Sequence, residues 1–308
     1  MARFVMLSYE FRQVQARNNQ SSQQTLFPAI DNNVIDENFK RKQELFAKFF
    51  LPENFPQMFE YKNRYYRVGL LWQYNGIIVF QLEKQGWHKQ SLDFQRKKIP
   101  DNPWIDIIVD NRHECQLIAV RKNTTAFKYQ NTVAEILSEN FTAFMLKNYG
   151  LTVSVRRQYH SRVFWDLYSN YYKTNGIEKL QFNLPFPNKD WMTEKIEELK
   201  QFGKKRNGAV RLGLEAAKGE ALYFEDNEEN KSLVNACSGT GVDILMKPKN
   251  HRMIHVVKEM NPVEQEMSDS TLQKVLSPDA QRSLFEDNDL TAYTRTAEFL
   301  NKCQQYYE

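Results

Sequence analysis

Residues 64–84 read RYYRVGLLWQYNGIIVFQLEK and predict a β-hairpin. Both halves are rich in β-branched and aromatic residues, which favour strands. The dipeptide Asn75-Gly76 separates them, and both of its residues tolerate the positive φ angles that a two-residue hairpin turn requires. Further β-prone runs follow at IDIIVD (residues 105–110) and CQLIAVRK (residues 115–122). We therefore expect a strand-rich region in the first half of the chain.

Helical spacing of apolar residues flanks this strand-rich region. It predicts one helix over IDENFKRKQELFAKFF (residues 35–50) and another over TVAEILSENFTAFMLKNYG (residues 132–150), which ends at its glycine. Residues 2–15 alternate in the manner of a strand. The region from residue 1 to residue 150 is therefore expected to form an N-terminal α+β domain.

After Gly150 the pattern becomes an alternation of strands and helices. Strands are predicted at LTVSVRRQY (151–159), IEKLQFNL (177–184), AVRLGLEA (209–216) and GVDILMKP (241–248). Helices are predicted at SRVFWDLYSNYY (161–172), DWMTEKIEELKQFGKK (190–205) and NHRMIHVVKEM (250–260), with an acidic loop at EDNEEN (225–230). This alternation predicts a two-layer β-α-β domain over residues 151–262, and residues 263–308 form a C-terminal helical segment. The predicted fold class is α+β, in two domains.

The composition is that of an ordinary globular protein. Of 308 residues, 41% are hydrophobic and 26% are charged. The three cysteines lie far apart, which argues against a disulfide framework or a zinc site and favours a reduced, cytoplasmic setting. The N-terminus lacks the pattern of a signal peptide, and no apolar run approaches the roughly 18 residues that a membrane-spanning helix needs.

Charge is distributed unevenly, although the formal net charge is only +4. The segment from Tyr61 to Lys98 holds two acids and eight basic residues: Lys62, Arg64, Arg67, Lys84, Lys89, Arg96, Lys97 and Lys98. Residues 247–258 hold four Lys or Arg and no acid. Acids gather instead at residues 215–229 and 259–289. Such segregation points to a surface for an anionic partner.

The strand end at Lys247 is the first candidate for an anion site. If a helix follows this strand, Lys247, Lys249 and Arg252 lie beside its N-terminus, where unpaired N–H groups favour phosphate. The alternative is that these cations are solvated residues that protect a strand end. The phosphate track is expected to include further basic residues: Arg156, Arg157, Lys204, Lys205 and Arg206. The last three are equally explained as a solvated cluster after a helix.

The sequence gives less support to a metal site, a nuclease site or a base-stacking surface. His251 and His255 are spaced for a metal on a helix, but the glutamate of the HExxH motif is absent, so no metal site is expected. Glu60 and Lys62 match half of a metal-dependent nuclease motif without the required aspartate on a neighbouring strand. Tyr65 and Tyr66 are either core residues or stacking platforms for unpaired bases. No constellation demands an enzyme or a cofactor.

The segment VDILMKPKNHRMIHVVKEM (residues 242–260) resembles the RexA family of phage exclusion proteins. In that family an apolar strand of the form DI-apolar-apolar-KPK runs into a basic helix. Upstream features agree in order: a G-apolar-apolar-x-F strand at 76–80, a proline-led strand at 103–109, an A-basic strand at 119–121, and TVSVRRQY at 152–159. The resemblance covers about residues 60–260, and its specific part is the KPK segment.

The resemblance implies a cytoplasmic, dimeric, two-domain α+β protein that binds DNA with little sequence preference. Such proteins act as the sensor of an abortive-infection system whose effector is a separate membrane protein. The family's KPK region is implicated in DNA contact, and this role falls here on Lys247, Lys249 and Arg252. The chain departs from the family in its long first loop and in an acidic insertion at residues 215–229, which leaves the DNA path and any shared partner open.

We therefore predict a non-enzymatic, largely sequence-independent double-stranded-DNA-binding sensor of a phage defence system. It is expected to form a homodimer and to need no small-molecule substrate. Two other functions stay open. One is a metal-dependent nuclease that uses Glu60 and Lys62, and the other is a scaffold whose acidic C-terminal segment, residues 263–308, binds a protein partner.

Overall fold

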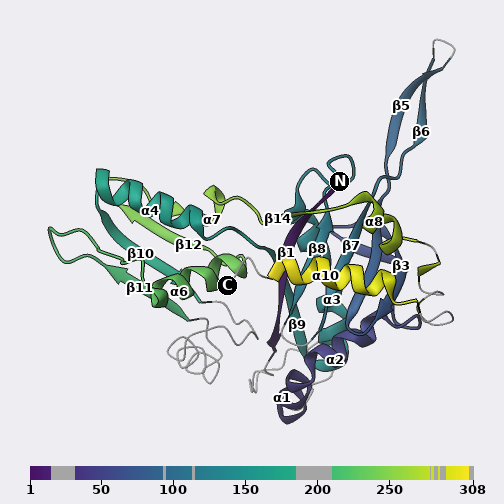
Figure 1. The fold of residues 1–308 in the computed structure, drawn as a ribbon, viewed down its shortest axis with the longest axis horizontal. Helices are drawn as coiled ribbons and strands as arrows, with labels where there is room; N and C mark the ends of the chain where they lie inside the picture. Colours follow the sequence, from purple (N-terminus) through teal and green to yellow (C-terminus); the bar gives the residue numbers. More distant parts are fainter. Residues whose placement is uncertain are drawn as a thin grey trace, which may run out of the picture. The chain divides into compact units, whose positions relative to one another are not determined.

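The structure is a computed structural model that describes residues 1–14, 32–92, 95–112, 115–184, 210–277, 279–280, 284 and 289–304. The chain forms two compact units (Figure 1). Unit 1 comprises Met1–Val155 and Glu264–Tyr306, and unit 2 comprises Arg156–Val263. The helix expected over residues 190–205 lies outside the described residues.

Unit 1 is built on an eight-stranded sheet. Its strands run in the order β14-β1-β8-β7-β4-β3-β2, and β9 also pairs with β1. The strands are β1 (Ala2–Gln13), β2 (Met58–Tyr61), β3 (Arg64–Tyr74), β4 (Ile77–Lys84), β7 (Trp104–Asp110), β8 (Leu117–Arg121), β9 (Leu151–Arg157) and β14 (Glu264–Met267). Neighbours along the seven-strand path are antiparallel. An antiparallel sheet packed with separate helices confirms the α+β class.

The hairpin predicted at Asn75-Gly76 is confirmed. Asn75 has a φ of 43° and Gly76 a φ of 79°, as a two-residue turn of this kind requires. The turn brings Tyr74 opposite Ile77 and starts the long β3–β4 ladder. The stop at Gly150 is confirmed as well, because this glycine caps the preceding helix in the left-handed conformation with a φ of 69°.

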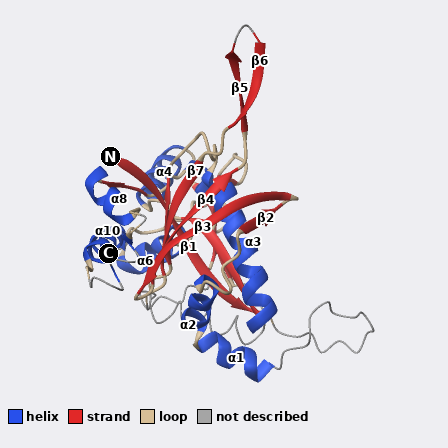
Figure 2. Ribbon diagram, turned by 90° about the vertical axis from the view of Figure 1, so that its right-hand side faces the viewer, coloured by secondary structure: helices blue, strands red, loops and turns tan. Residues whose placement is uncertain are grey.

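One face of the unit 1 sheet packs against the N-terminal helices and a long central helix (Figure 2). These elements are α1 (Asn32–Lys40), α2 (Lys42–Ala47), the short 3-10 helix η1 (Lys48–Phe50) and α3 (Gln130–Tyr149). The single helix expected over residues 35–50 is therefore divided, with a break at Arg41. Phe46, Phe49 and Phe50 surround the ring of Phe141 on α3, at centroid distances of 5.0, 5.3 and 5.8 Å. This aromatic cluster joins the helices to the sheet.

The other face of the unit 1 sheet packs against C-terminal residues. Helices α8 (Asp269–Val275) and α10 (Thr291–Gln304) provide this layer. The Phe4 ring lies 5.3 Å from that of Phe299, and Trp72 Nε1 donates a 2.7 Å hydrogen bond to the Val275 carbonyl. Strand β14 pairs with β1, so that Ala2 lies opposite Met267. The described part of the segment 263–308 thus completes the sheet and core of unit 1. Deletion of this segment would therefore expose the core of unit 1.

A two-stranded ribbon extends from the β4 and β7 end of unit 1 (Figures 1 and 2). It consists of β5 (Trp87–Leu92) and β6 (Gln95–Pro100), which form a sheet of their own. Lys89 lies opposite Lys98, and Trp87 lies opposite Pro100. The β-prone, basic segment noted in the sequence therefore includes a hairpin outside the main sheet.

Unit 2 is a four-stranded antiparallel sheet with helices packed on one face. The sheet order is β11 (Arg211–Glu215), β10 (Ile177–Asn183), β12 (Ile244–Pro248) and β13 (Ile254–His255). The helices are α4 (Arg162–Thr174), α6 (Glu228–Gly239) and the four-residue α7 (Val256–Glu259). Their buried side chains share one core with alternate residues of β10 and β12, among them Leu180, Phe182, Ile244 and Met246. The other face of these two strands carries mainly polar residues, among them Glu178, Lys179 and Lys247, together with Leu245.

The acidic loop expected at residues 225–230 is in part the start of α6. The Asn227 side chain caps this helix by accepting a 2.9 Å hydrogen bond from the Asn230 backbone N–H. Glu228 and Glu229 occupy the first turn, where negative charge is favourable for the helix dipole. The stabilisation of the α6 N-terminus therefore accounts for the acidic residues Glu228 and Glu229.

Candidate nucleic-acid interface

The helix predicted over residues 250–260 forms only over Val256–Glu259, so the expected anion site at a helix N-terminus beside Lys247 and Lys249 is absent. The chain turns at residues 248–251 instead, where the His251 N–H donates to the Pro248 carbonyl at 3.2 Å. Asn250 adopts a left-handed φ of 63° in this turn. Residues 254–255 then pair with β12, with Met246 opposite Ile254. Helix α7 begins only at Val256. Strand pairing has overridden the local helical pattern at residues 254–255, and the chain then buries Val256 in the core of unit 2.

Lys247 is neutralised by an acid that the local sequence did not reveal. Its Nζ lies 2.6 Å from Glu178 Oε1, on the neighbouring strand β10. Lys179 and Glu215 form a similar pair, also at 2.6 Å, and the hydrogen bond from Lys179 lowers the pKa of Glu215. Each of these two lysines thus has an acid partner on a neighbouring strand, although Lys179 and Lys247 lie directly opposite each other. Lys247 therefore adds little net positive charge.

Lys249 and Arg252 differ from Lys247 because no ion pair neutralises them among the described residues. Lys249 Nζ donates a 3.2 Å hydrogen bond to the Gly219 carbonyl, and the Lys249 backbone N–H donates to the Gly176 carbonyl at 2.9 Å. The aliphatic stem of Lys249 also lies against Gly176. These contacts hold the amine beside two other chain segments without cancelling its charge. Arg252 is exposed in the following turn.

Two further cations lie on the segments that Lys249 contacts. Lys218 immediately precedes Gly219, and Lys173 on α4 lies three residues before Gly176; both are exposed. We define Lys173, Lys218, Lys249 and Arg252 as the cationic end of unit 2. Glu220 is the exposed acid nearest in sequence to this group. The sequence carried no signal for Lys173 or Lys218, because each stands alone in its segment and only the fold gathers them.

Arg156 and Arg157 are the last two residues of β9, where the chain passes from the unit 1 sheet into unit 2. A Cβ added to Gly241 would come within 2.0 Å of the Arg157 carbonyl oxygen and 2.9 Å of Arg156 Cβ. Both arginines therefore pack beside the start of the segment that leads into β12, whereas Lys247 and Lys249 lie at its far end. The Arg157 guanidinium stacks over Tyr159 at 5.5 Å. Lys204, Lys205 and Arg206 lie outside the described residues.

The histidines of the basic segment do not form a metal site together. His251 packs its ring against Tyr171 at a centroid distance of 5.8 Å, and His255 Nδ1 lies 2.5 Å from Asp243 Oδ2. Because the helix that would align them is absent, they take separate partners. Within the described ranges, no three His, Cys, Asp or Glu side chains are grouped to hold a metal ion.

The half-motif at Glu60 and Lys62 is also arranged unlike a nuclease site. Glu60 lies on β2, but Lys62 lies in the turn that follows, with a φ of 49°. The Lys62 amine faces Glu135 at 3.6 Å, and the hydroxyl of the neighbouring Tyr61 also donates to Glu135. Tyr66 is buried beside the Phe127 ring and acts as a core residue, whereas Tyr65 is exposed.

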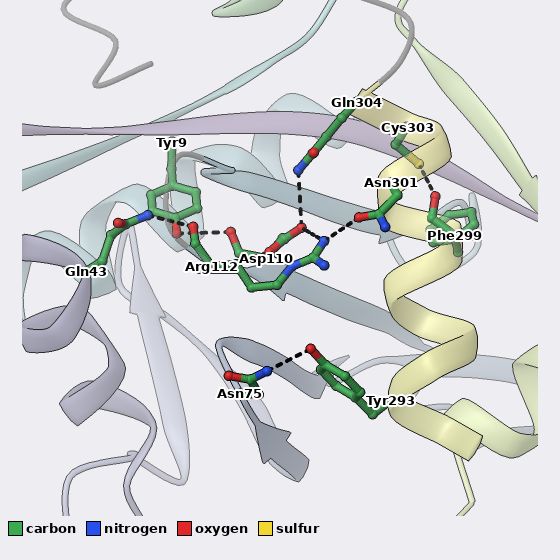
Figure 3. Close-up of polar contacts among 10 residues, drawn as sticks. All are labelled: Tyr9, Gln43, Asn75, Asp110, Arg112, Tyr293, Phe299, Asn301, Cys303 and Gln304. Carbon is green, nitrogen blue, oxygen red and sulfur yellow. Dashed lines mark hydrogen bonds and ion pairs between the residues drawn. The ribbon is translucent and has the colours of Figure 1, made fainter. Parts of the chain in front are cut away.

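The most elaborate polar cluster lies in unit 1 and fastens α10 to the sheet (Figure 3). The buried Asp110 carboxylate accepts two hydrogen bonds from the Arg112 guanidinium, at 2.8 and 2.7 Å. Gln304 reaches the same carboxylate at 3.4 Å, and Arg112 also donates to Asn301 at 2.8 Å. The hydrogen bond to Asp110 raises the pKa of Arg112 above its ordinary value, so the guanidinium stays charged. The buried Tyr9 hydroxyl donates to Asn111 at 2.8 Å. These polar groups form hydrogen bonds with one another. The cluster therefore has a structural role, which is to hold α10 on the sheet.

The cysteines allow a direct test of this packing. We expect Cys115, which is partly exposed, to react with an alkylating reagent in the folded protein, and Cys237 and Cys303 to be protected. Burial raises the pKa of the Cys303 thiol to about 12, so at pH 8 roughly one molecule in ten thousand carries the reactive thiolate. Mass spectrometry after alkylation at pH 8, with and without denaturant, measures this. Equal labelling of Cys115 and Cys303 without denaturant would contradict the packing of α10.

Comparison with protein-family models, curated proteins and solved structures finds no match to this chain. Along the described parts of the chain, every helix is too short or too polar to cross a membrane.

Proposed function

We propose that this protein is a non-enzymatic, largely sequence-independent double-stranded-DNA-binding sensor of a phage exclusion system. It would act as a homodimer upstream of a separate membrane effector. The observation that carries the DNA-binding part is the cationic end of unit 2, where Lys173, Lys218, Lys249 and Arg252 come from three segments of the chain. The phage exclusion part rests on the resemblance of residues 242–260 to the RexA family.

The chemistry of the cationic end suits phosphate. Lysine and arginine side chains on a surface bind backbone phosphates and release counterions from DNA, which supplies affinity without sequence choice. Lys249 is held by the Gly176 and Gly219 carbonyls, so its amine is positioned before a ligand arrives. We do not propose Lys247 as a principal phosphate contact, because Glu178 already pairs with its amine.

Removal of two cations from this end is expected to weaken DNA binding. A Lys249→Ala/Arg252→Ala variant should lose about tenfold or more in affinity for a duplex, since hydrogen bonds to charged groups contribute roughly 1.5–3 kcal/mol each. The slope of log affinity against log salt should become shallower by about 2, or roughly 0.9 for each lost phosphate contact. Fluorescence anisotropy with one labelled duplex at several salt concentrations measures both quantities.

The chain offers a matched control in the Lys247–Glu178 pair. A Glu178→Ala/Lys247→Ala variant removes two side chains from the same region and leaves the net charge unchanged. It should bind like the wild type and keep the salt slope. If both variants bind equally well, the cationic end is not the phosphate site. If the wild type binds no duplex at low salt, the proposed function is wrong.

A further inference from the structure

The β5–β6 ribbon has an architecture that the core of unit 1 does not need. In the described part of the chain, β5 and β6 pair only with each other and add no strand to the main sheet. Both views show the ribbon leaving the body of unit 1 (Figures 1 and 2). An isolated two-stranded hairpin is at best marginally stable in water, and the ribbon gains no support from pairing with the main sheet.

The root of the ribbon is fixed by its backbone. The Lys84 N–H donates to the Pro103 carbonyl, and the Asp101 N–H donates to the Gly86 carbonyl, each at 3.0 Å. A Cβ on Gly86 would lie 2.6 Å from the Asp101 carbonyl oxygen, so the two strands cross closely at a residue without a side chain. The ribbon therefore continues the β4–β7 ladder through a tight, hydrogen-bonded neck.

The charge of the ribbon follows from its sequence and register. Residues 87–100 include four Lys or Arg and one acid, Asp93. Directly opposite residues share a face of an antiparallel ribbon, which places Lys89, Arg96 and Lys98 at positions of one face. Lys89 stands opposite Lys98 in the register of the ribbon. Three basic residues at positions of one face give the ribbon a sequence that suits a polyanion.

Exposed tryptophans at the root point to a partner independently of the charge. Trp87 is 69% exposed and Trp104 is 51% exposed. Trp87 begins β5, on the same face as Lys89, and Trp104 begins β7, just beyond the neck. Tryptophan is enriched at binding surfaces, where its large ring is buried against a partner.

We infer that the β5–β6 ribbon is a groove-binding arm for B-form duplex DNA, an inference that rests on the proposed DNA-binding function. Six residues per strand span about 20 Å, at roughly 3.4 Å per residue. The major groove of B-DNA, about 12 Å wide and 8.5 Å deep, admits a two-stranded ribbon. The major groove of A-form RNA is too narrow for side chains to read. The arm therefore selects duplex DNA over duplex RNA.

The test compares two variants that each lose three positive charges from unit 1. The ribbon variant is Lys89→Gln/Arg96→Gln/Lys98→Gln. The control is Lys128→Gln/Lys147→Gln/Lys302→Gln, whose three lysines are exposed and lie outside the ribbon. A Lys89→Arg/Lys98→Arg variant, which keeps the charge, tests whether loss of binding reflects charge or misfolding. Thermal unfolding of each protein, followed by circular dichroism, shows whether the variant is folded. Anisotropy is measured with a labelled DNA duplex and an RNA duplex of the same sequence.

The wild type is expected to bind the DNA duplex at least tenfold more tightly than the RNA duplex. The ribbon variant should lose about tenfold or more in DNA affinity and most of this preference, whereas the control and the arginine variant should keep the preference. If the wild type binds both duplexes equally, or if the ribbon variant keeps its preference for DNA, the groove-binding role is wrong while the proposed function stands. If the wild type binds neither duplex, both proposals are wrong.

Discussion

Replacement of Arg112 by alanine is expected to lower the free energy of unfolding of unit 1 by about 3–5 kcal/mol, the usual cost of leaving a buried charge without its partner. The Asp110 side chain is fully buried, and Arg112 supplies two of the hydrogen bonds that its carboxylate accepts. Arg112 also donates to Asn301, so its loss loosens α10 as well. Urea denaturation followed by far-ultraviolet circular dichroism measures the change.

An exposed ion pair in the same unit provides the control for Arg112. Arg3 pairs with Glu266 at 3.0 Å, but both side chains are about half exposed or more, at 62% and 49%. Arg3→Ala should therefore cost about 1 kcal/mol or less. An Asp110→Asn/Arg112→Met variant, which removes both charges, should recover much of the lost stability, because the buried charge causes the penalty. Equal stability of Arg3→Ala and Arg112→Ala would show that Asp110 does not depend on its guanidinium.

Gly241→Ala is expected to destabilise unit 2 by about 2–5 kcal/mol. Gly241 has a φ of 65°, where a side chain costs roughly 1–2 kcal/mol, and the new Cβ would lie 2.0 Å from the Arg157 carbonyl oxygen. The obstacle is backbone, which cannot move aside as a flexible side chain would, and such overpacking costs roughly 1–3 kcal/mol more. The midpoint of thermal or urea unfolding should fall accordingly.

Gly219→Ala separates the two causes. Gly219 also has a positive φ, of 88°, but nothing lies within 4 Å of a Cβ added there. Its replacement should therefore cost only the conformational part, about 1–2 kcal/mol. If Gly241→Ala destabilises unit 2 no more than Gly219→Ala does, the expected clash between the new Cβ and the Arg157 carbonyl oxygen does not occur.

Local chemistry was sufficient to predict the features that depend on a few neighbouring residues. Asn75-Gly76 specifies its hairpin because these two residues adopt positive φ with little strain. Gly150 ends α3 for the same reason. Strands such as β4, β7 and β8 follow from their β-branched runs, since a β-branched side chain packs well on a pleated, buried surface. From these elements the α+β class could be predicted without any knowledge of which strands pair.

Contacts between distant segments decided what local pattern could not. Residues 250–255 carry helical spacing, yet Ile254 and His255 pair with β12, because backbone pairing with an existing strand outweighs a weak helix propensity. Lys247 looked unbalanced along the sequence, yet Glu178 lies 2.6 Å away across the sheet. Strand register, which depends on the whole fold, determines such partners.

The candidate interface shows the same division. The sequence alone determined that positive charge gathers in residues 61–98 and 247–258, since composition is a local property. Only the tertiary structure placed Lys247 in a neutral pair, brought the chain segments that carry Lys173 and Lys218 into contact with Lys249, and placed β5 and β6 outside the main sheet as a ribbon. The physical reason is that a surface charge acts through its neighbours in space, within a Debye length of about 8–10 Å, and the fold chooses those neighbours.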